Sequence, residues 1–278
     1  MKALRIDSHQ HFWNYDPKKH VWMNDDMKIL KTDYLPHDLE PLLNHHNLDG
    51  CVAVQANQAE IENDFLLSLS NQYNFIRGVV GWIDLQAKNV TERLEYYQNF
   101  SKMKGFRHII QDEQDINFML RPAFIKGVLE LKQFGYSYDI LIFAAHLPNT
   151  LAFIKALPNQ PFVIDHIAKP NIKAGEIEIW KKYMKEISSY KNVYCKISGM
   201  VTEADWKNWK KEDFIKYLDV VVEAFGIDRI MYGSDWPVCT LAASYDQQFT
   251  IIKEYFANFS KTEQESFFGI NASNFYHL

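Results

Sequence analysis

Eight short apolar segments alternate with longer amphipathic segments along the 278 residues, and each strand-plus-helix unit takes roughly 35 residues. The first strand ends near Ile6, and the other seven are predicted over 51–55, 78–83, 105–109, 136–142, 161–166, 193–199 and 229–232. Helices are predicted from residue 35 and over 60–73, 90–100, 121–134, 146–157, 176–190, 214–225 and 245–259, with a short helical tail between 262 and 275. Apolar strands without regular alternation are typical of a parallel sheet covered on both faces.

This pattern predicts an α/β fold, a (β/α)8 TIM barrel, as a single domain over residues 1–278. The alternative is a doubly wound open sheet, which carries a glycine-rich turn after its first strand. No such turn follows the first predicted strand, where the sequence reads Asp-Ser-His-Gln-His from residue 7. The closed barrel is therefore the preferred prediction.

The composition limits the partners that such a domain would have. A formal net charge of -5 and a pI near 6.1 argue against nucleic acid or an anionic membrane as partner. No apolar run reaches the length of about 18 residues that a transmembrane helix needs, and the start of the chain lacks the apolar core of a signal peptide. Cys51, Cys195 and Cys239 are too few and too widely spaced for a disulfide framework. We expect a cytoplasmic protein that takes a small molecule, with homo-oligomerisation left open.

The first strand leads into His9 and His11, which are two residues apart. In an extended chain such residues point to the same side, and neutral imidazoles bind metals, polarise carbonyls and relay protons. The last predicted strand leads into Ser234, Asp235 and Trp236. If the first and last strands are neighbours in a closed barrel, His9, His11 and Asp235 meet.

Other strand ends are polar as well, and barrel active sites lie at the carboxyl ends of the strands. These residues are Gln55, Asn57, Asp84, Arg107, His108, Asp165, His166, Lys169, Lys196 and Ser198. Alternatives stay open for several of them: Asp84 and Asp165 would also serve as caps, and Lys196 as part of a structural ion pair. His108 would face away from the pocket if Arg107 faces it, because neighbours on a strand alternate. The long polar and aromatic loop over 13–34 is either a flap over a pocket or a surface excursion.

Five segments together resemble the amidohydrolase superfamily. They are Asp-Ser-His-Gln-His-Phe-Trp at 7–13, Gly-Phe-Arg-His-Ile-Ile-Gln-Asp-Glu at 105–113, Val-Ile-Asp-His-Ile-Ala-Lys-Pro at 163–170, Lys-Ile-Ser-Gly-Met-Val-Thr-Glu-Ala at 196–204 and Tyr-Gly-Ser-Asp-Trp-Pro-Val-Cys at 232–239. More narrowly, they resemble its sugar-lactone hydrolase branch, which includes L-fuconolactonase and L-rhamnonolactonase and is similar to 2-pyrone-4,6-dicarboxylate lactonase. The resemblance covers nearly the whole chain.

The resemblance implies a distorted barrel that hydrolyses a cyclic ester, such as L-fuconolactone or L-rhamnonolactone. It implies that His9, His11 and His166 line the site and that Asp235 handles the proton of the attacking water. Beside Trp236, partial desolvation is expected to raise the pKa of Asp235. The residues expected to contact the substrate are Arg107, His108, Lys196, Gln111, Trp13 and Trp236, although both tryptophans also suit the core.

The metal content stays open at this level. Superfamily members with two metals use a bridging lysine or carboxylate at the fourth strand, whereas this chain has Arg107 and His108 there. A two-metal centre is therefore not expected. His9, His11 and Asp235, together with His166, would hold one divalent ion, with zinc the first choice; a metal-independent enzyme is the other possibility. Rival functions are a metal-dependent decarboxylase of the same superfamily and a non-catalytic binding barrel.

Overall fold

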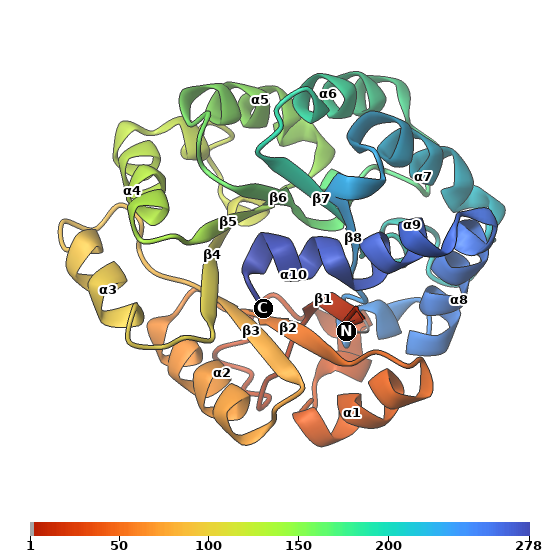
Figure 1. Cartoon of the computed structure of the whole chain (residues 1–278), viewed down its shortest axis with the longest axis horizontal. Coiled ribbons are helices and arrows are strands. Elements are labelled where there is room, and N and C mark those ends of the chain that lie inside the picture. The colour runs from red at the N-terminus through yellow and green to blue at the C-terminus, as the bar shows by residue number, and fades with distance from the viewer. Residues whose placement is uncertain (1–2) are drawn as a thin grey trace.

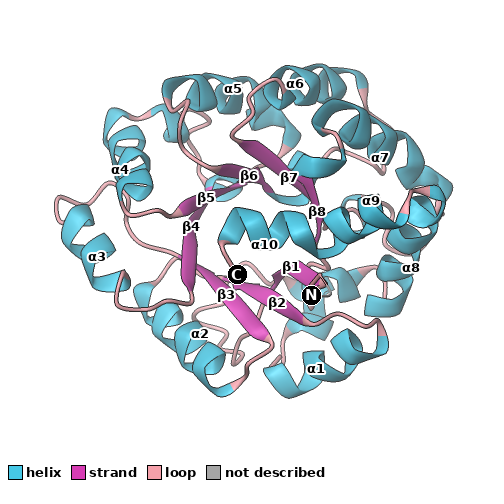
Figure 2. Ribbon diagram, viewed as in Figure 1, coloured by secondary structure: helices cyan, strands magenta, loops and turns pink. Residues whose placement is uncertain are grey.

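A computed structural model describes residues 3–278; the first two residues of the predicted domain lie outside the described range. Within that range, eight parallel strands are hydrogen-bonded in chain order, and helices surround them (Figures 1 and 2). The strands are β1 (Ile6–Gln10), β2 (Gly50–Val54), β3 (Ile76–Gly81), β4 (Met103–Ile109), β5 (Ser137–Leu141), β6 (Phe162–Ile164), β7 (Val193–Ile197) and β8 (Ile230–Tyr232). The predicted (β/α)8 barrel is confirmed.

A helix follows each strand and covers the outside of the barrel, and two short helices follow the last of these. The helices are α1 (Pro36–His45), α2 (Glu60–Gln72), α3 (Val90–Tyr97), α4 (Pro122–Gln133), α5 (Leu147–Ala156), α6 (Glu178–Ser188), α7 (Glu212–Phe225), α8 (Tyr245–Tyr255), α9 (Lys261–Glu265) and α10 (Asn271–Tyr276). Proline at the first position of α1 and α4 fits a helix start, where its missing N–H group has no partner to lose. No helix in residues 3–278 is long and apolar enough to cross a bilayer.

The ends of the sheet meet just beyond β1 and β8. Asp235 N donates to His9 O at 2.8 Å, and His11 N donates to Trp236 O at 2.7 Å. A parallel bridge joins Gln10 and Trp236 at the same place. The predicted neighbourhood of the first and last strands is therefore present, and it closes the barrel at the carboxyl ends of these strands.

The end of the barrel interior that packs against α10 is apolar. Ile6, Val52, Val80, Val163 and Met231 pack there in one cluster with Phe275 and Tyr276 of α10. Figure 1 shows α10 lying across the centre of the ring of strands. Because Ile6 is the first residue of β1, α10 covers the amino ends of the strands. A site for small molecules is left to the opposite end.

The loop over 13–34 is folded back onto the barrel. Trp13 N donates to Tyr34 O at 3.0 Å and Tyr34 N donates to Trp13 O at 2.9 Å, so both ends of the loop are held together. Trp13, Met23 and Leu30 form a small buried cluster between them. The three cysteines are buried free thiols, as expected for a protein without disulfides.

Three strands, β3, β6 and β7, end two residues earlier than the sequence predicts, and β1 continues to Gln10, beyond its predicted end near Ile6. β6 stops at Ile164, because the chain turns at 165–168 and the four residues from His166 to Lys169 all have positive φ. β7 stops at Ile197, since Gly199 has a φ of 61° that continues no strand. The ends of β6 and β7 lie where the polar residues gather.

Candidate active site

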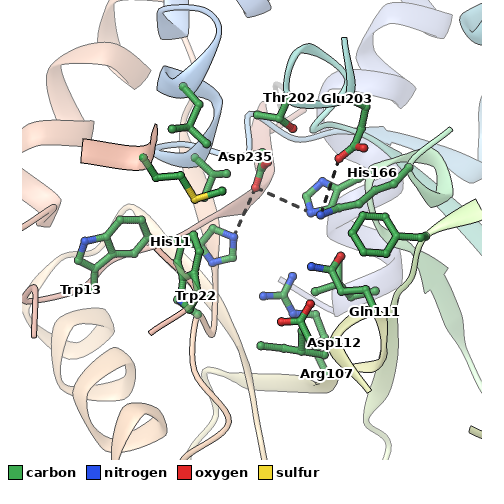
Figure 3. A pocket seen from close by; sticks show the side chains of 18 of the residues that line it. His11, Trp13, Trp22, Arg107, Gln111, Asp112, His166, Thr202, Glu203 and Asp235 are labelled. Atoms are coloured by element: carbon green, nitrogen blue, oxygen red, sulfur yellow. Dashed lines mark ion pairs between the residues drawn. The ribbon is translucent and has the colours of Figure 1, made fainter. Parts of the chain in front are cut away.

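A pocket of about 320 Å³ opens at the carboxyl ends of the strands (Figure 3). Its volume is at the lower end of the range for small-molecule sites, roughly 300–1,000 Å³. The predicted site residues that line it are His11, Trp13, Arg107, Gln111, His166 and Asp235. Trp22 and Met27 also line it, so the loop over 13–34 forms one wall of the pocket and is more than a surface excursion.

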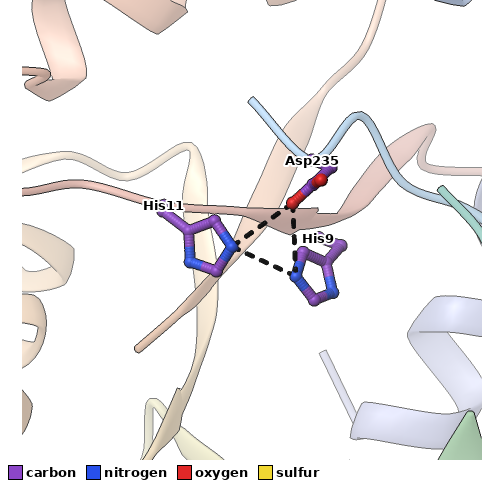
Figure 4. A group of neighbouring side chains, drawn as sticks. All are labelled: His9, His11 and Asp235. Carbon is purple, nitrogen blue, oxygen red and sulfur yellow. Dashed lines mark hydrogen bonds and ion pairs between the residues drawn. The ribbon is translucent and has the colours of Figure 1, made fainter. Parts of the chain in front are cut away.

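The two histidines of the His-x-His motif and Asp235 converge as predicted (Figure 4). His9 Nε2 lies 3.2 Å from His11 Nε2. Asp235 Oδ1 lies 3.5 Å from His11 Nε2 and 3.9 Å from His9 Nε2. His9 is fully buried and, unlike His11, does not line the pocket.

Asp7 fixes the ends of β1 and β8 relative to each other. Its Oδ1 accepts from the backbone N–H groups of His9 (3.2 Å) and Ser234 (2.8 Å), and its Oδ2 accepts from the Tyr245 hydroxyl (3.0 Å). Burial raises the pKa of Asp7 to about 6, although these hydrogen bonds oppose the rise. Asp7 thus holds the backbone on both sides of the convergence without touching the pocket.

Hydrogen bonds to the far ring nitrogens orient the imidazoles. His11 Nδ1 lies 2.7 Å from Val54 O, and because a carbonyl only accepts, His11 carries its proton on Nδ1. The lone pair of His11 Nε2 therefore faces His9 and Asp235. His9 Nδ1 has two neighbours of opposite kind: Lys196 Nζ at 3.1 Å and Asp165 Oδ1 at 3.3 Å.

His166 enters the pocket from the turn after β6. Its Nε2 lies 3.8 Å from Asp235 Oδ1, and its Nδ1 lies 2.9 Å from Ser198 Oγ. Its ring centroid is 4.4 Å from that of His9. A Cβ atom at Gly199 would stand 2.6 Å from His166 Nδ1, so only glycine leaves room for this ring. Three imidazoles therefore surround the Asp235 carboxylate.

Arg107 lies inside the barrel mouth and faces the pocket. Its Nη1 donates to Asp165 Oδ2 at 3.1 Å and lies 3.3 Å from His9 Nε2, while its Nη2 donates to Gln55 O. The guanidinium is only 3% exposed. A fixed and desolvated cation is thus aimed at the same region as His166 and Asp235.

Burial sets the charge state of the site. It lowers the pKa of His9, His11 and His166 below the ordinary value, so all three are neutral at neutral pH. Burial alone would raise the pKa of Asp235, but the adjacent His166, His11 and Lys169 outweigh it, and the net pKa is lowered. The expectation of a raised pKa at Asp235 is wrong, because it counted desolvation and left out these neighbours.

Lys196 does not reach the pocket. Its Nζ lies 2.5 Å from Asp139 Oδ2 and 3.0 Å from Asp165 Oδ1, and all three side chains are fully buried. Tyr276 of α10 donates to the same Asp139 oxygen at 2.7 Å. The alternative of a structural ion pair therefore describes Lys196, and the prediction that it contacts the substrate is corrected.

Two further predicted contacts lie elsewhere. His108 points away from the pocket: it stacks on Phe118 at 4.6 Å, and its Nε2 lies 2.7 Å from Glu113 Oε1. Strand alternation turns His108 outward because Arg107 faces inward. Trp236 is 4% exposed and packs edge-on against Phe12, so it belongs to the core.

Some residues in and under the pocket were missed in the sequence. Glu203, Thr202 and Trp206 line the pocket from the segment after β7. Glu203 stands in one of the five segments that carry the resemblance, but nothing in the spacing there indicates which side chains face inward. Asp139 lies in an apolar strand, where a single acid is a visible signal for a buried partner.

The donor set fits one divalent metal ion. His9, His11 and Asp235 each offer one ligand atom, and these atoms lie within 4.8 Å of one another. Imidazole nitrogens and a carboxylate oxygen are zinc ligands, and Val54 O is the kind of outer acceptor that orients a ligating histidine. Asp165 Oδ1 is buried and lies 3.3 Å from His9 Nδ1 and 3.0 Å from Lys196 Nζ. It would accept the Nδ1 proton of a His9 whose Nε2 binds a metal.

The fold and this site define a class: (β/α)8 barrels with a histidine and aspartate centre at the carboxyl ends of the strands. The sequence model of the amidohydrolase family matches residues 6–278. The chain belongs to the amidohydrolase family, as its five segments predict.

Curated relatives and solved structures agree with this assignment. The chain is 38% identical to an L-fucono-1,5-lactonase of Burkholderia multivorans, over 100% of this chain and 97% of that protein. It is 28% identical to an L-rhamnono-gamma-lactonase of Scheffersomyces stipitis over 52% of this chain and 48% of that protein. A crystal structure of a Burkholderia multivorans amidohydrolase with bound zinc, 38% identical, covers 99% of this chain and 100% of that chain with a TM-score of 0.95.

Proposed function

We propose that this protein hydrolyses a sugar-derived lactone, such as L-fuconolactone or L-rhamnonolactone, to the corresponding acid. The names of the two lactonase relatives support the substrate class. The observation that carries the proposal is the placement of the Asp235 carboxylate in the pocket, 3.5 Å from His11 Nε2 and 3.8 Å from His166 Nε2. A carboxylate held in this way is suited to move the protons that ester hydrolysis requires.

Asp235 acts first as a base and then as an acid. Its lowered pKa keeps it ionised at neutral pH, so it accepts a proton from the attacking water. The same carboxyl then returns a proton to the ring oxygen as the ester bond breaks. His11 and His166 flank this carboxylate, with their Nε2 atoms 3.5 and 3.8 Å from Asp235 Oδ1.

The carbonyl oxygen of the lactone gains negative charge as water adds to it. Arg107, a buried cation, and His166 both line the pocket. Donors that are already oriented stabilise such charge without reorganisation. Gln111 Oε1 is buried without a hydrogen bond among the described residues, so it is free to accept from a sugar hydroxyl.

One divalent ion, with zinc the first choice, is the proposed occupant of the site formed by His9, His11 and Asp235, which His166 also faces. When bound, it would polarise the carbonyl and acidify water. The zinc in the related crystal structure supports this choice of metal. The single domain, the cytoplasmic location and a homo-oligomer stay predictions from the sequence.

A pH-indicator screen of aldonolactones with the purified protein, with and without a chelator, tests the proposal. We expect acid release from L-fuconolactone or L-rhamnonolactone well above the spontaneous rate. Activity that survives complete metal removal would assign the polarising role to Arg107 and His166 alone. No acid release from any aldonolactone would contradict the proposal and leave the decarboxylase or the binding barrel.

A further inference from the structure

The turn after β6 has a backbone that non-glycine residues rarely adopt. His166, Ile167, Ala168 and Lys169 have φ values of 52°, 48°, 59° and 45°, and none of them is glycine. Left-handed conformations are costly for L-residues and normally occur at single positions. In a helical turn with about three residues per turn, side chains that are three residues apart lie on the same side. His166 and Lys169 accordingly both line the pocket.

Packing on the other side of this turn holds it in place. Ile167 and Ala168 are fully buried in the main core. Ile167 O accepts a hydrogen bond of 2.7 Å from Trp180 Nε1. Packing of this turn therefore compensates for its unfavourable left-handed backbone conformation. The turn in that conformation presents two polar side chains, His166 and Lys169, to the pocket. One of them, His166, already has a place in the proposed chemistry.

Lys169 faces Glu203 across a gap in the pocket wall. Lys169 Nζ lies 3.9 Å from Glu203 Oε1, and the two side chains are 16% and 19% exposed. This separation is too long for a hydrogen bond. Neither charged group makes a side-chain hydrogen bond within residues 3–278, although Lys169 Nζ also lies 5.3 Å from the ring centre of Phe143. Figure 3 shows Glu203 beside Thr202, on the side of the pocket where His166 enters.

We propose that Lys169 and Glu203 together bind a hydroxyl group of the lactone and so determine specificity for polyhydroxylated substrates. This inference rests on the proposed function. A hydroxyl placed between the two groups would accept from the ammonium and donate to the carboxylate, which no single charged residue offers. Because the pair is neutral overall, it suits a hydroxyl and gives no net attraction to a substrate carboxylate.

The chain contains a matched pair for comparison. Lys173 Nζ and Asp205 Oδ2 are also 3.9 Å apart and lie on the same two segments, but they are 67% and 39% exposed and do not line the pocket. Substitutions there change the same charges in the same loops. If a substitution acts by destabilising the loops or by changing the electrostatic potential at the protein surface, the variants of both pairs should show the effect.

The experiment compares Lys169→Met and Glu203→Gln with Lys173→Met and Asp205→Asn. Each is assayed on the best aldonolactone and on δ-valerolactone, which has the ring ester and no hydroxyl. We expect kcat/KM for the aldonolactone to fall about tenfold to hundredfold in the pocket variants, mainly through KM, as loss of a charge-assisted hydrogen bond predicts. We expect kcat/KM for δ-valerolactone to fall less than kcat/KM for the aldonolactone, because the charge of Lys169 also acts on Asp235 whereas the hydroxyl contact is absent. The control variants should match the wild type on both substrates.

Binding provides a second measurement that needs no turnover. A polyhydroxylated δ-lactam, titrated by calorimetry, should bind Lys169→Met at least about tenfold more weakly than wild type, with Lys169→Arg in between. Equal losses on both lactones, or an unchanged lactam affinity in folded Lys169→Met, would overturn the inference. A wild type that opens no lactone but shows the Lys169-dependent lactam binding would contradict the proposed function and leave the binding pair standing.

Discussion

Lys196 Nζ lies 3.1 Å from His9 Nδ1 in the fully buried interior of the barrel, between the apolar lower layer and the pocket. The same ammonium contacts Asp139 and Asp165, and Tyr276 near the end of the chain donates to Asp139. The middle of the barrel is thus a charged layer. It joins the helix that covers the amino ends of the strands to the first histidine of the site.

Replacing Lys196 tests whether this layer is needed for stability. Lys196→Met leaves Asp139 buried without a cation and Asp165 with Arg107 alone, and breaking a buried pair in this way costs about 3–5 kcal/mol of unfolding free energy. Urea unfolding followed by circular dichroism gives the value. Lys185→Met is the control, because its pair with Glu223 at 2.7 Å is on the surface; we expect a loss below about 1 kcal/mol there. Equal small losses in both variants would show that Lys196 contributes little.

Gly199→Ala tests whether the position of the His166 ring depends on the space that Gly199 leaves beside it. The added Cβ would stand 2.6 Å from His166 Nδ1, so the ring must move. A displacement of about 1 Å in a catalytic group can reduce the rate about 100-fold, and we expect a loss of that order in kcat/KM.

Gly135→Ala separates this clash from backbone strain. Gly135 also has a positive φ, of 75°, but a Cβ there meets nothing within 4 Å. Both variants should lose some stability, because alanine is strained at positive φ. Only Gly199→Ala should lose activity. Comparable activity in the two variants would mean that His166 tolerates displacement or has no part in the reaction.

The sequence predicts the barrel well because each level of the pattern agrees with the others. Apolar strands alternate with amphipathic helices, and polar residues stand at the carboxyl end of every predicted strand except the fifth. The meeting of His9, His11 and Asp235 follows from closure of the barrel alone, and their ligand atoms lie within 4.8 Å of one another. Contacts between strand ends follow from the topology of the barrel, and the order of strands and helices along the sequence determines that topology.

Side-chain direction is less accessible from the sequence. Arg107 and His108 are adjacent, and only the register of β4 shows that Arg107 faces the pocket. Lys196 stands near the carboxyl end of its strand, as a pocket residue would, but its side chain lies in the buried interior below the pocket. The turn at 166–169 contains no glycine or asparagine, so nothing in its composition indicates a left-handed backbone. Its conformation comes from tertiary packing, and Lys169 consequently went unnoticed as a partner of Glu203.

Glu62 should make stability depend on pH. Burial raises its pKa to about 7, although the backbone N–H groups of Ala56 and Asn57 oppose the rise. Between the unfolded value near 4.5 and this one, the folded state keeps a proton that the unfolded state has released. The free energy of unfolding therefore falls as pH rises through this interval, by about 3 kcal/mol in total from this group, and is unaffected by it at higher pH.

Unfolding of Glu62→Gln at pH 4.5 and 7.5 isolates that contribution. The variant should gain up to about 3 kcal/mol relative to wild type between the two pH values, since glutamine does not titrate. Glu40→Gln, at an exposed position of α1, is the control. A difference between Glu62→Gln and wild type that is the same at both pH values would show that Glu62 does not carry the effect.

The donor set predicts at most one tightly held divalent ion per chain. His9, His11 and Asp235 form one group of ligand atoms. The one lysine of β4, Lys104, lies near the start of the strand and donates to His277 O, so it does not bridge a second ion in the pocket. Elemental analysis of protein purified with zinc should give no more than one equivalent, and His11→Ala should lose it. Two tightly bound ions in the wild type would contradict the assignment.

The rate of Asp235→Asn on the best aldonolactone tests the central claim most directly. The amide is nearly isosteric with the carboxylate but cannot accept the proton of water, so the fold should persist and the loss should fall on kcat. General acid–base groups contribute typically about 10²–10⁴-fold, and that is the expected drop. Circular dichroism controls for folding. A well-folded Asp235→Asn with near-wild-type kcat would contradict the account, because Asp235 would then be structural.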